Sequence, residues 1–164
     1  MNMKKTLLIS TIFTIGLCFL EPICSAYNHN ISPEENLINA SISGSLDDVF
    51  MSINHNVNIN VHKDAQGNTP GCSPLMLAVM NDYISIVNVL LNNNADVNDT
   101  NDNGNTALIY GALHNNVDAA KILIATGNVK INIRNNKGET ALKVAMRKNH
   151  LQMIDLLTSN GAQI

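Results

Sequence analysis

The sequence predicts an all-α solenoid of about four helix-turn-helix units with short hairpin loops, preceded by a signal peptide. Two observations favour the solenoid. A five-residue core that begins with glycine and ends with leucine occurs three times, at spacings of 33 and 34 residues. Each copy precedes two apolar stretches with helical periodicity and a polar, asparagine-rich turn. A period of about 20 to 50 residues indicates stacked units that bury their apolar faces against one another.

The first 26 residues resemble a secretory signal peptide. Lys4 and Lys5 form a short positive region, and an apolar stretch of 14 residues follows over Leu7–Leu20. That stretch is shorter than the roughly 20 residues of a membrane-spanning helix, and small residues at Cys24–Ala26 suit cleavage after Ala26. We therefore expect a secreted or periplasmic protein without stable membrane insertion after cleavage. A short membrane anchor that stays attached is the alternative.

The repeated cores are Gly71–Leu75, Gly104–Leu108 and Gly138–Leu142, and each reads Gly-x-Ser/Thr-Pro/Ala-Leu. Glycine at or beside these turns permits a positive φ, which other residues rarely adopt. The second helix of a unit is clearest in Ile86–Leu91 and in Met153–Leu157. The predicted core consists of apolar residues from both helices of the units, namely Leu75, Ala78, Ile86, Val87, Leu90, Leu108, Ala112, Ala120, Leu123, Leu142, Ala145, Ile154 and Leu157.

These residues resemble ankyrin repeats, a family with a period near 33 in which each unit is a β-turn followed by two antiparallel helices. Val97-Asn98 matches the closing pair of the family motif, and His150 stands at the family's histidine near the start of the second helix. Ala78, Gly111 and Ala145 stand at its small position between the helices. The resemblance implies an ankyrin domain at 34–164 with repeats at about 34–61, 67–98, 101–132 and 135–164, which leaves an N-terminal segment at 27–33 after the signal peptide at 1–26.

The first unit has no turn motif and begins instead at a predicted helix cap. Ser32 is the expected N-cap, Pro33 the first helical residue, and Glu35 the residue that reaches back to the cap. An atypical first unit is expected, because an end unit has a neighbour on only one side. The second unit has about five extra residues in its entry loop, within His62–Pro70.

The family's Thr-Pro-Leu-His motif lacks its histidine in all three cores. Met76, Ile109 and Lys143 stand in that place, so the hydrogen bonds of the histidine are missing. We therefore expect an array less stable than an idealised one. The many asparagines favour turns, and we attribute their number to nucleotide composition rather than to a functional asparagine ladder.

Composition and motifs argue against catalysis and nucleic-acid binding. The net charge is −3, from 10 basic and 13 acidic residues, and aromatic residues make up only 4%. The chain therefore offers neither a basic clamp nor a platform for stacking bases. The sequence has no phosphate-binding loop, His-Glu-x-x-His helix or Cys-x-x-Cys pair. We expect a monomer that is not an enzyme, needs no cofactor and binds no nucleic acid.

The resemblance implies a protein partner on the concave face, which loop tips and the exposed ends of the first helices form. Lys137, Arg147 and Lys148 gather near the C-terminal end, so the partner should carry some acidic character there. Exchange of Arg147 and Lys148 for Glu should weaken capture. The predicted contact residues at the tips are Lys63, Asp64, Gln66, Asn101, Asp102, Asn103, Asn135, Asn136 and Lys137. Those on the helices are Met80, Asn81, Leu113, His114, Arg147 and Lys148.

A second hypothesis is a periplasmic protective or metal-handling factor. Cleavage after Ala26 would leave Tyr27-Asn28-His29 at the new N-terminus. A free amine, two backbone nitrogens and the imidazole of His29 suit square-planar Cu(II) or Ni(II). Cys72 would then be the one remaining cysteine. Metal stoichiometry and thiol reactivity separate this hypothesis from partner capture.

Overall fold

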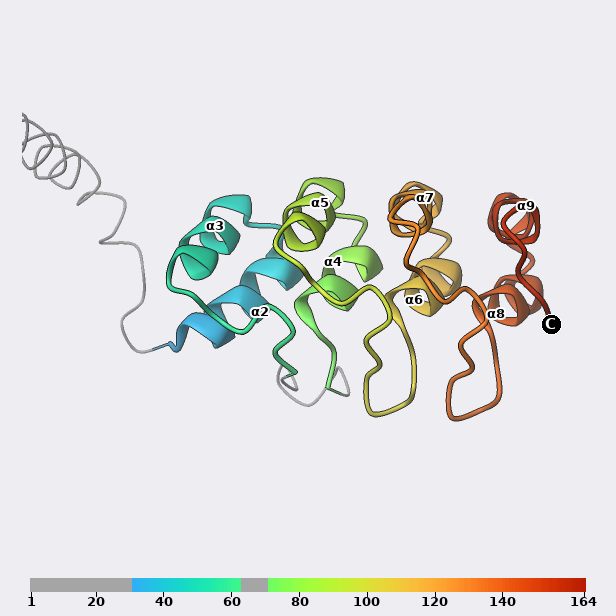
Figure 1. The fold of residues 1–164 in the computed structure, drawn as a ribbon, viewed down its shortest axis with the longest axis horizontal. Helices are drawn as coiled ribbons and strands as arrows, with labels where there is room; N and C mark the ends of the chain where they lie inside the picture. The colour runs from blue at the N-terminus through green and yellow to red at the C-terminus, as the bar shows by residue number, and fades with distance from the viewer. Residues whose placement is uncertain (1–30, 63–70) are drawn as a thin grey trace, which may run out of the picture. The chain divides into compact units, whose positions relative to one another are not determined.

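The computed structural model describes residues 31–62 and 71–164, which form four helix pairs (Figure 1). The pairs are α2 (Pro33–Ser43) with α3 (Leu46–Asn54), α4 (Pro74–Met80) with α5 (Ile84–Asn92), α6 (Ala107–His114) with α7 (Val117–Ala125), and α8 (Ala141–Lys148) with α9 (Leu151–Ser159). The described ranges hold no β-strand, so the prediction of an all-α array of helix pairs is confirmed there. The predicted signal peptide and the metal site at His29 lie outside the described residues, and the predicted repeat bounds stay a prediction.

The helices stack in two rows within the unit formed by residues 33–164. In one row α4 packs between α2 and α6, and α6 packs between α4 and α8. The second helices α3, α5, α7 and α9 form the other row. The loops before α6 and α8 extend beyond the row of first helices (Figure 1), so loop tips and first helices share one surface. No helix in these described ranges is long and apolar enough to cross a bilayer.

Threonine hydroxyls cap the N-termini of α6 and α8, the first helices of their units, although the family's histidine is missing there. The Thr106 hydroxyl accepts the backbone N–H of Ile109 at 3.3 Å, and the Thr140 hydroxyl accepts that of Lys143 at 3.2 Å. Ser73 makes no such bond before α4, where proline occupies the first turn. The first helix begins at Pro33, as predicted. The lower stability expected from the missing histidine stays a prediction.

Asparagine takes the left-handed conformation that closes many of these helices. Non-glycine residues with positive φ in the described part are Asp82 and four asparagines, namely Asn56, Asn94, Asn115 and Asn149. Each of them lies just after the end of a helix. At the equivalent position of the other units stands either a glycine or another of these five residues. Asparagine tolerates this backbone region better than most residues, so these positions have a conformational reason to carry it.

Three other asparagines link consecutive units through side-chain oxygens. Asn60 accepts the backbone N–H of Asp96 at 2.8 Å, and Asn98 accepts that of Lys130 at 2.6 Å. Asn132 repeats the bond to the N–H of Gln163 at 2.8 Å. Our attribution of the asparagines to nucleotide composition alone is therefore insufficient: at these positions they form a ladder that holds each loop on the next.

The predicted core is buried except at one position. Ile154 is only partly buried, whereas its neighbour Met153 is fully buried. Met153 and Leu157 are four residues apart and so share the helix face that points into the stack. Ile154 lies one position off that face. Apolar composition in α9 did not reveal which of two adjacent residues points inward.

Candidate partner-binding groove

Two asparagines shape the loop tips before α6 and α8. The Asn101 side-chain oxygen accepts the backbone N–H groups of Asn103 at 3.0 Å and Asn105 at 2.9 Å. Asn135 accepts those of Lys137 and Glu139 in the same way, at 3.0 Å each. Each asparagine therefore replaces missing backbone partners within its own turn, and the two loops have the same form.

This role corrects one predicted contact residue. Asn101 is only 5% exposed, because its oxygen serves the turn and its amide donates to the Tyr110 hydroxyl at 2.8 Å. It cannot offer its side chain to a partner while the turn is folded. Its counterpart Asn135 is partly buried, and its amide donates to the Asn105 side chain at 2.9 Å.

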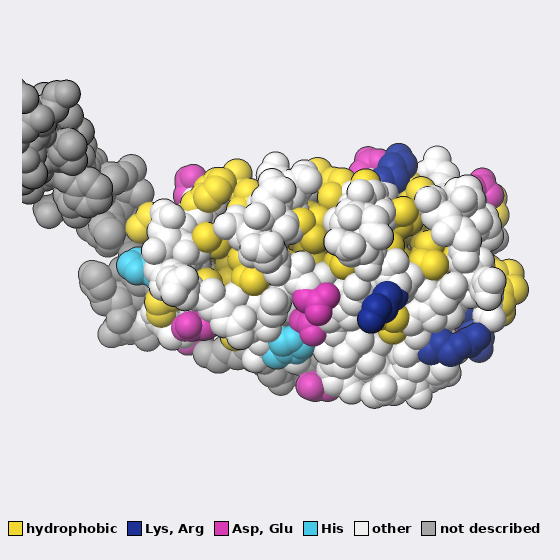
Figure 2. Space-filling model, viewed as in Figure 1, with side chains coloured by type: hydrophobic (Ala, Val, Ile, Leu, Met, Phe, Trp, Pro, Cys, Tyr) yellow, Lys and Arg dark blue, Asp and Glu magenta, His cyan; other side chains and the backbone are white. Residues whose placement is uncertain are grey.

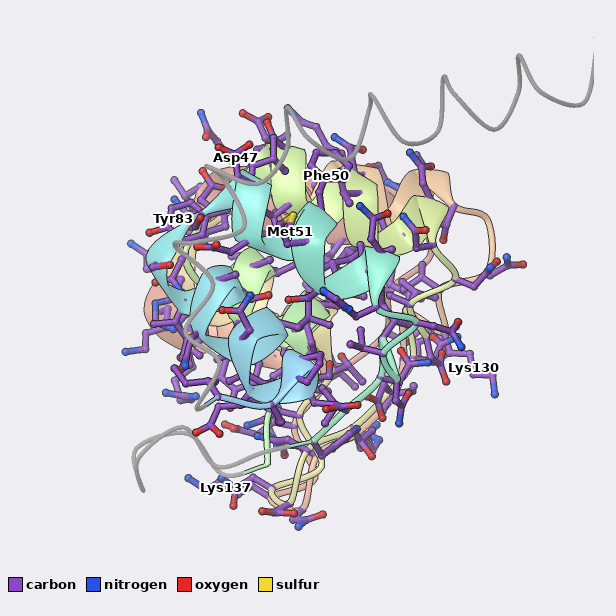
Figure 3. All side chains as sticks on the ribbon, turned by 90° about the vertical axis from the view of Figure 1, so that its left-hand side faces the viewer. Asp47, Phe50, Met51, Tyr83, Lys130 and Lys137 are labelled. Atoms are coloured by element: carbon purple, nitrogen blue, oxygen red, sulfur yellow. The ribbon has the colours of Figure 1, made fainter. Side chains whose placement is uncertain are left out.

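The two tips are tied into one edge. The Asn136 backbone N–H donates to the Asn103 carbonyl at 3.0 Å, and the Asn136 side chain donates to the Asp102 carbonyl at 2.9 Å. Figure 3 views the array along its length and shows Lys137 among the tips, on the opposite side of the molecule from Phe50 and Met51 of α3. The described tips before α6 and α8, from Asp102 and Asn103 to Asn136 and Lys137, therefore form one rim beside these helices.

A groove of about 350 Å³ lies between this rim and helices α6 and α8. Seven predicted contact residues line it: Asn103, Leu113, Asn135, Asn136, Lys137, Arg147 and Lys148. Four further lining residues were missed by sequence reasoning: Asn105, Ile109, Glu139 and Val144. Ile109 and Val144 are apolar helix residues, which sequence reasoning cannot tell from ordinary core. Glu139 occupies the variable second position of the repeated core motif, so the pattern gives no sign of a role for its side chain.

Glu139 and Arg147 form an ion pair at the groove wall. The guanidinium Nε donates to a Glu139 carboxylate oxygen at 2.9 Å. This hydrogen bond lowers the pKa of Glu139 below its usual value, although partial burial acts in the opposite direction. The charge of Arg147 is therefore largely matched within the molecule. Lys137 and Lys148 make no side-chain ion pair with any residue of the described ranges, so they supply the groove's uncompensated positive charge.

The pKa of His114 is lowered by its burial and by nearby positive charge. It is the last residue of α6, directly after Leu113 of the groove, although it does not itself line the groove. Burial lowers its pKa below the usual value, and the charges of Lys148 and His150 lower it further. His150 also contacts α6, because its Nδ1 lies 2.9 Å from the Ala112 carbonyl.

The remaining predicted contact residues lie apart from the groove. Met80 is partly buried at the end of α4, and Asn81 is exposed just after it. The Asn81 side chain donates to the Leu77 carbonyl at 2.9 Å, which is a common way to finish a helix. Asp102 is exposed at its tip but does not line the groove. Lys63, Asp64 and Gln66 lie outside the described residues.

Cys72 lies in a buried polar cluster, not at the groove. Its thiol donates to the Tyr110 hydroxyl at 3.4 Å, and the Asn101 amide also reaches the sulfur at 3.5 Å. Burial raises the pKa of Tyr110 to about 12. Cys72 has no exposed surface, so reagents cannot reach the thiol that the metal-handling hypothesis would use. The residues that the structure describes contain no group of three histidine, cysteine or acidic side chains placed to hold a metal.

Charge is divided unevenly along the array. Described residues up to 102 carry eight carboxylates and no lysine or arginine. Residues 103–164 carry seven lysines and arginines and three carboxylates. On the face shown in Figure 2, the visible lysine and arginine side chains all lie over the part that holds α6–α9. The groove therefore lies in the basic half of the molecule.

Comparison with known protein families identifies these repeats. A family model described as ankyrin repeats, in three copies, matches residues 75–164. The match spans the three helix pairs from α4 to α9 and includes every residue that lines the groove. Ankyrin repeats commonly mediate protein–protein interactions and are typically not catalytic. The comparison with curated proteins gave no match.

Proposed function

Because the chain belongs to the ankyrin repeat family, we propose that it is a binding module without catalysis, whose protein partner docks on the groove between the loop tips and helices α6 and α8. One observation carries this proposal. Seven residues that the family resemblance implied as contacts line a single groove, although they come from two loops and two helices. An open groove of this kind suits a protein surface better than a small substrate, which needs enclosure.

The partner should be acidic where it meets the groove. Lys137 and Lys148 are not neutralised within the described residues, whereas Arg147 is engaged by Glu139. A partner that brings carboxylates to the two lysines gains complementary charge, and it avoids the repulsion that a basic partner would meet. The acidic half of the array, which holds α2 to α5, does not offer this complementarity.

We also propose export to the periplasm or beyond, on the strength of the sequence of residues 1–26. Determination of the N-terminus of the protein from its native source tests this. A mature chain that begins at Tyr27 supports export, and an intact Met1 in a cytosolic fraction contradicts it.

Charge reversal in the groove tests the binding proposal. Exchange of Arg147 is a poor choice, because it also breaks the pair with Glu139. The variant Lys137→Glu/Lys148→Glu changes only the two uncompensated lysines. The matched control is Lys130→Glu/Lys143→Glu, which reverses two exposed lysines outside the groove lining.

Capture from the native source, read by quantitative mass spectrometry, should lose its specific partner with the groove variant and keep it with the control. Circular dichroism checks that both variants are folded. Equal capture by both variants would contradict a partner in this groove, and equal loss would indicate attraction by overall charge alone.

A further inference from the structure

We infer that the groove recognises an extended peptide segment of about five residues, with an acidic residue at each end and an aliphatic residue between them. This inference rests on the proposed function and names the chemistry that the same groove selects. It combines three features of the groove: its apolar floor, the positions of its two lysines, and its exposed amides.

The floor of the groove is aliphatic. Ile109 and Val144 are buried residues of α6 and α8, and Leu113 is half-buried one turn beyond Ile109. Leu113 keeps apolar surface between charged and polar walls, above the buried Ile109 and Val144, so a single aliphatic side chain from a partner can pack against it. Removal of such a side chain from water typically changes affinity by about tenfold to a hundredfold.

Both lysines line the groove, and along the chain one precedes α8 and the other ends it. Lys137 belongs to the loop tip, and Lys148 is the last residue of α8. The eight residues of α8 alone correspond to a length of about 12 Å at 1.5 Å per residue. An extended chain advances about 3.3 Å per residue, so the first and last Cα atoms of five residues are about 13 Å apart. A five-residue segment therefore matches the length of α8, the helix that leads from the loop of Lys137 to Lys148, and we take it to present one carboxylate near each lysine.

The wall favours an extended backbone. The Asn103 side chain is exposed and makes no hydrogen bond with the described residues. Its amide can donate to one peptide carbonyl and accept from one peptide N–H. Asn136 beside it holds the two tips together through the Asp102 carbonyl, which keeps this edge in place. The groove lining holds no aromatic side chain on which a nucleic-acid base could stack.

Synthetic peptides test the inference by fluorescence anisotropy with the full purified chain. The reference probe carries Glu-Ser-Leu-Ser-Glu between glycine-serine flanks, and a second probe has the same composition in the order Glu-Glu-Leu-Ser-Ser. We expect the reference to bind about tenfold more tightly than the reordered probe. Replacement of its leucine by serine, or of either glutamate by glutamine, should each weaken binding by about tenfold.

Charge reversal in the protein tests the end of the segment that meets Lys148. Lys148→Glu should weaken the reference probe by about tenfold or more and should favour a probe with lysine at one end. Lys143→Glu, an exposed lysine of the same helix outside the groove, should leave binding unchanged. Equal affinity for the reordered probe, absence of measurable binding, or equally tight binding of oligothymidylate would each overturn the inference. If capture of a protein still depends on Lys137 and Lys148 in those cases, the proposed function stands and only the segment chemistry is wrong.

Discussion

At the scale of single residues, two glycines in the loop tips have nearly the same positive φ but different surroundings. Gly104 has a φ of +72°, and a Cβ there would lie 2.9 Å from the Asn136 backbone nitrogen. Gly138 has nearly the same φ, +70°, and a Cβ there would meet nothing within 4 Å. The two glycines therefore share a conformational demand and differ in their contact with the next tip.

This difference predicts unequal effects of two identical substitutions. Gly138→Ala should destabilise by about 1 to 2 kcal/mol, because alanine disfavours positive φ. Gly104→Ala should destabilise by more, because the new Cβ also displaces Asn136 and the bond to the Asn103 carbonyl. Urea unfolding of both variants measures the difference. Equal destabilisation would show that the contact between the tips contributes nothing.

At the scale of the helix, stability depends on which face the next unit covers. Ser41, Val79 and Ala112 hold the same place in α2, α4 and α6, and all three are fully buried. Met146 holds this place in α8 and is 47% exposed. The same helical position is therefore core in three helices and partly solvated in the last.

Two methionine truncations test this gradient. Met76 of α4 is 1% exposed, so Met76→Ala should remove buried contacts and leave a cavity, which destabilises by about 2 to 4 kcal/mol. Met146→Ala should change stability by less than about 1 kcal/mol, because half of its surface is already in water. Thermal or urea unfolding reports both values. A large effect at Met146 would mean that something covers this end of the array in solution.

At the scale of the whole molecule, the uneven distribution of charge favours approach of an acidic ligand to one half of the array. The acidic half repels the carboxylates that the basic half attracts, so an acidic segment is steered toward α6–α9. His114 lies in this basic half, and burial, Lys148 and His150 hold its pKa below its usual 6.5. Without ligand, His114 is therefore neutral at pH 7.

Binding should consequently tighten as the pH falls. A carboxylate at Lys148 offsets the charge that depresses the pKa of His114, so the complex takes up a proton more readily than the free protein does. Affinity for the acidic reference peptide should rise between about pH 7 and pH 5.5, while its glutamates stay ionised. It should also fall with added salt. Anisotropy titrations across pH measure this, with His114→Gln as the control that should remove the pH dependence. Tighter binding at high pH would contradict the proposed placement of the carboxylate.

The linear pattern was sufficient for the helices and for most of the groove. The recurring cores and apolar stretches determine where helices begin and which stretches are buried, because helix period and turn geometry are local properties. The resemblance to ankyrin repeats implied that Lys137, Lys148 and Leu113 share one surface, and stacking places equivalent positions of successive units side by side. These predictions needed no knowledge of any particular contact.

Tertiary structure decided what depends on residues far apart in the chain. The burial of Asn101 follows from Tyr110 and Cys72, and the ion pair of Glu139 with Arg147 removes one predicted free charge. Bonds such as that of Asn98 to Lys130 join loops 32 residues apart. A repeating sequence predicts that the units stack. Which atoms are in contact between two stacked units depends on how the units pack. The sequence therefore predicted the array of helix pairs and a face for contact, and the fold determined which side chains are exposed on that face.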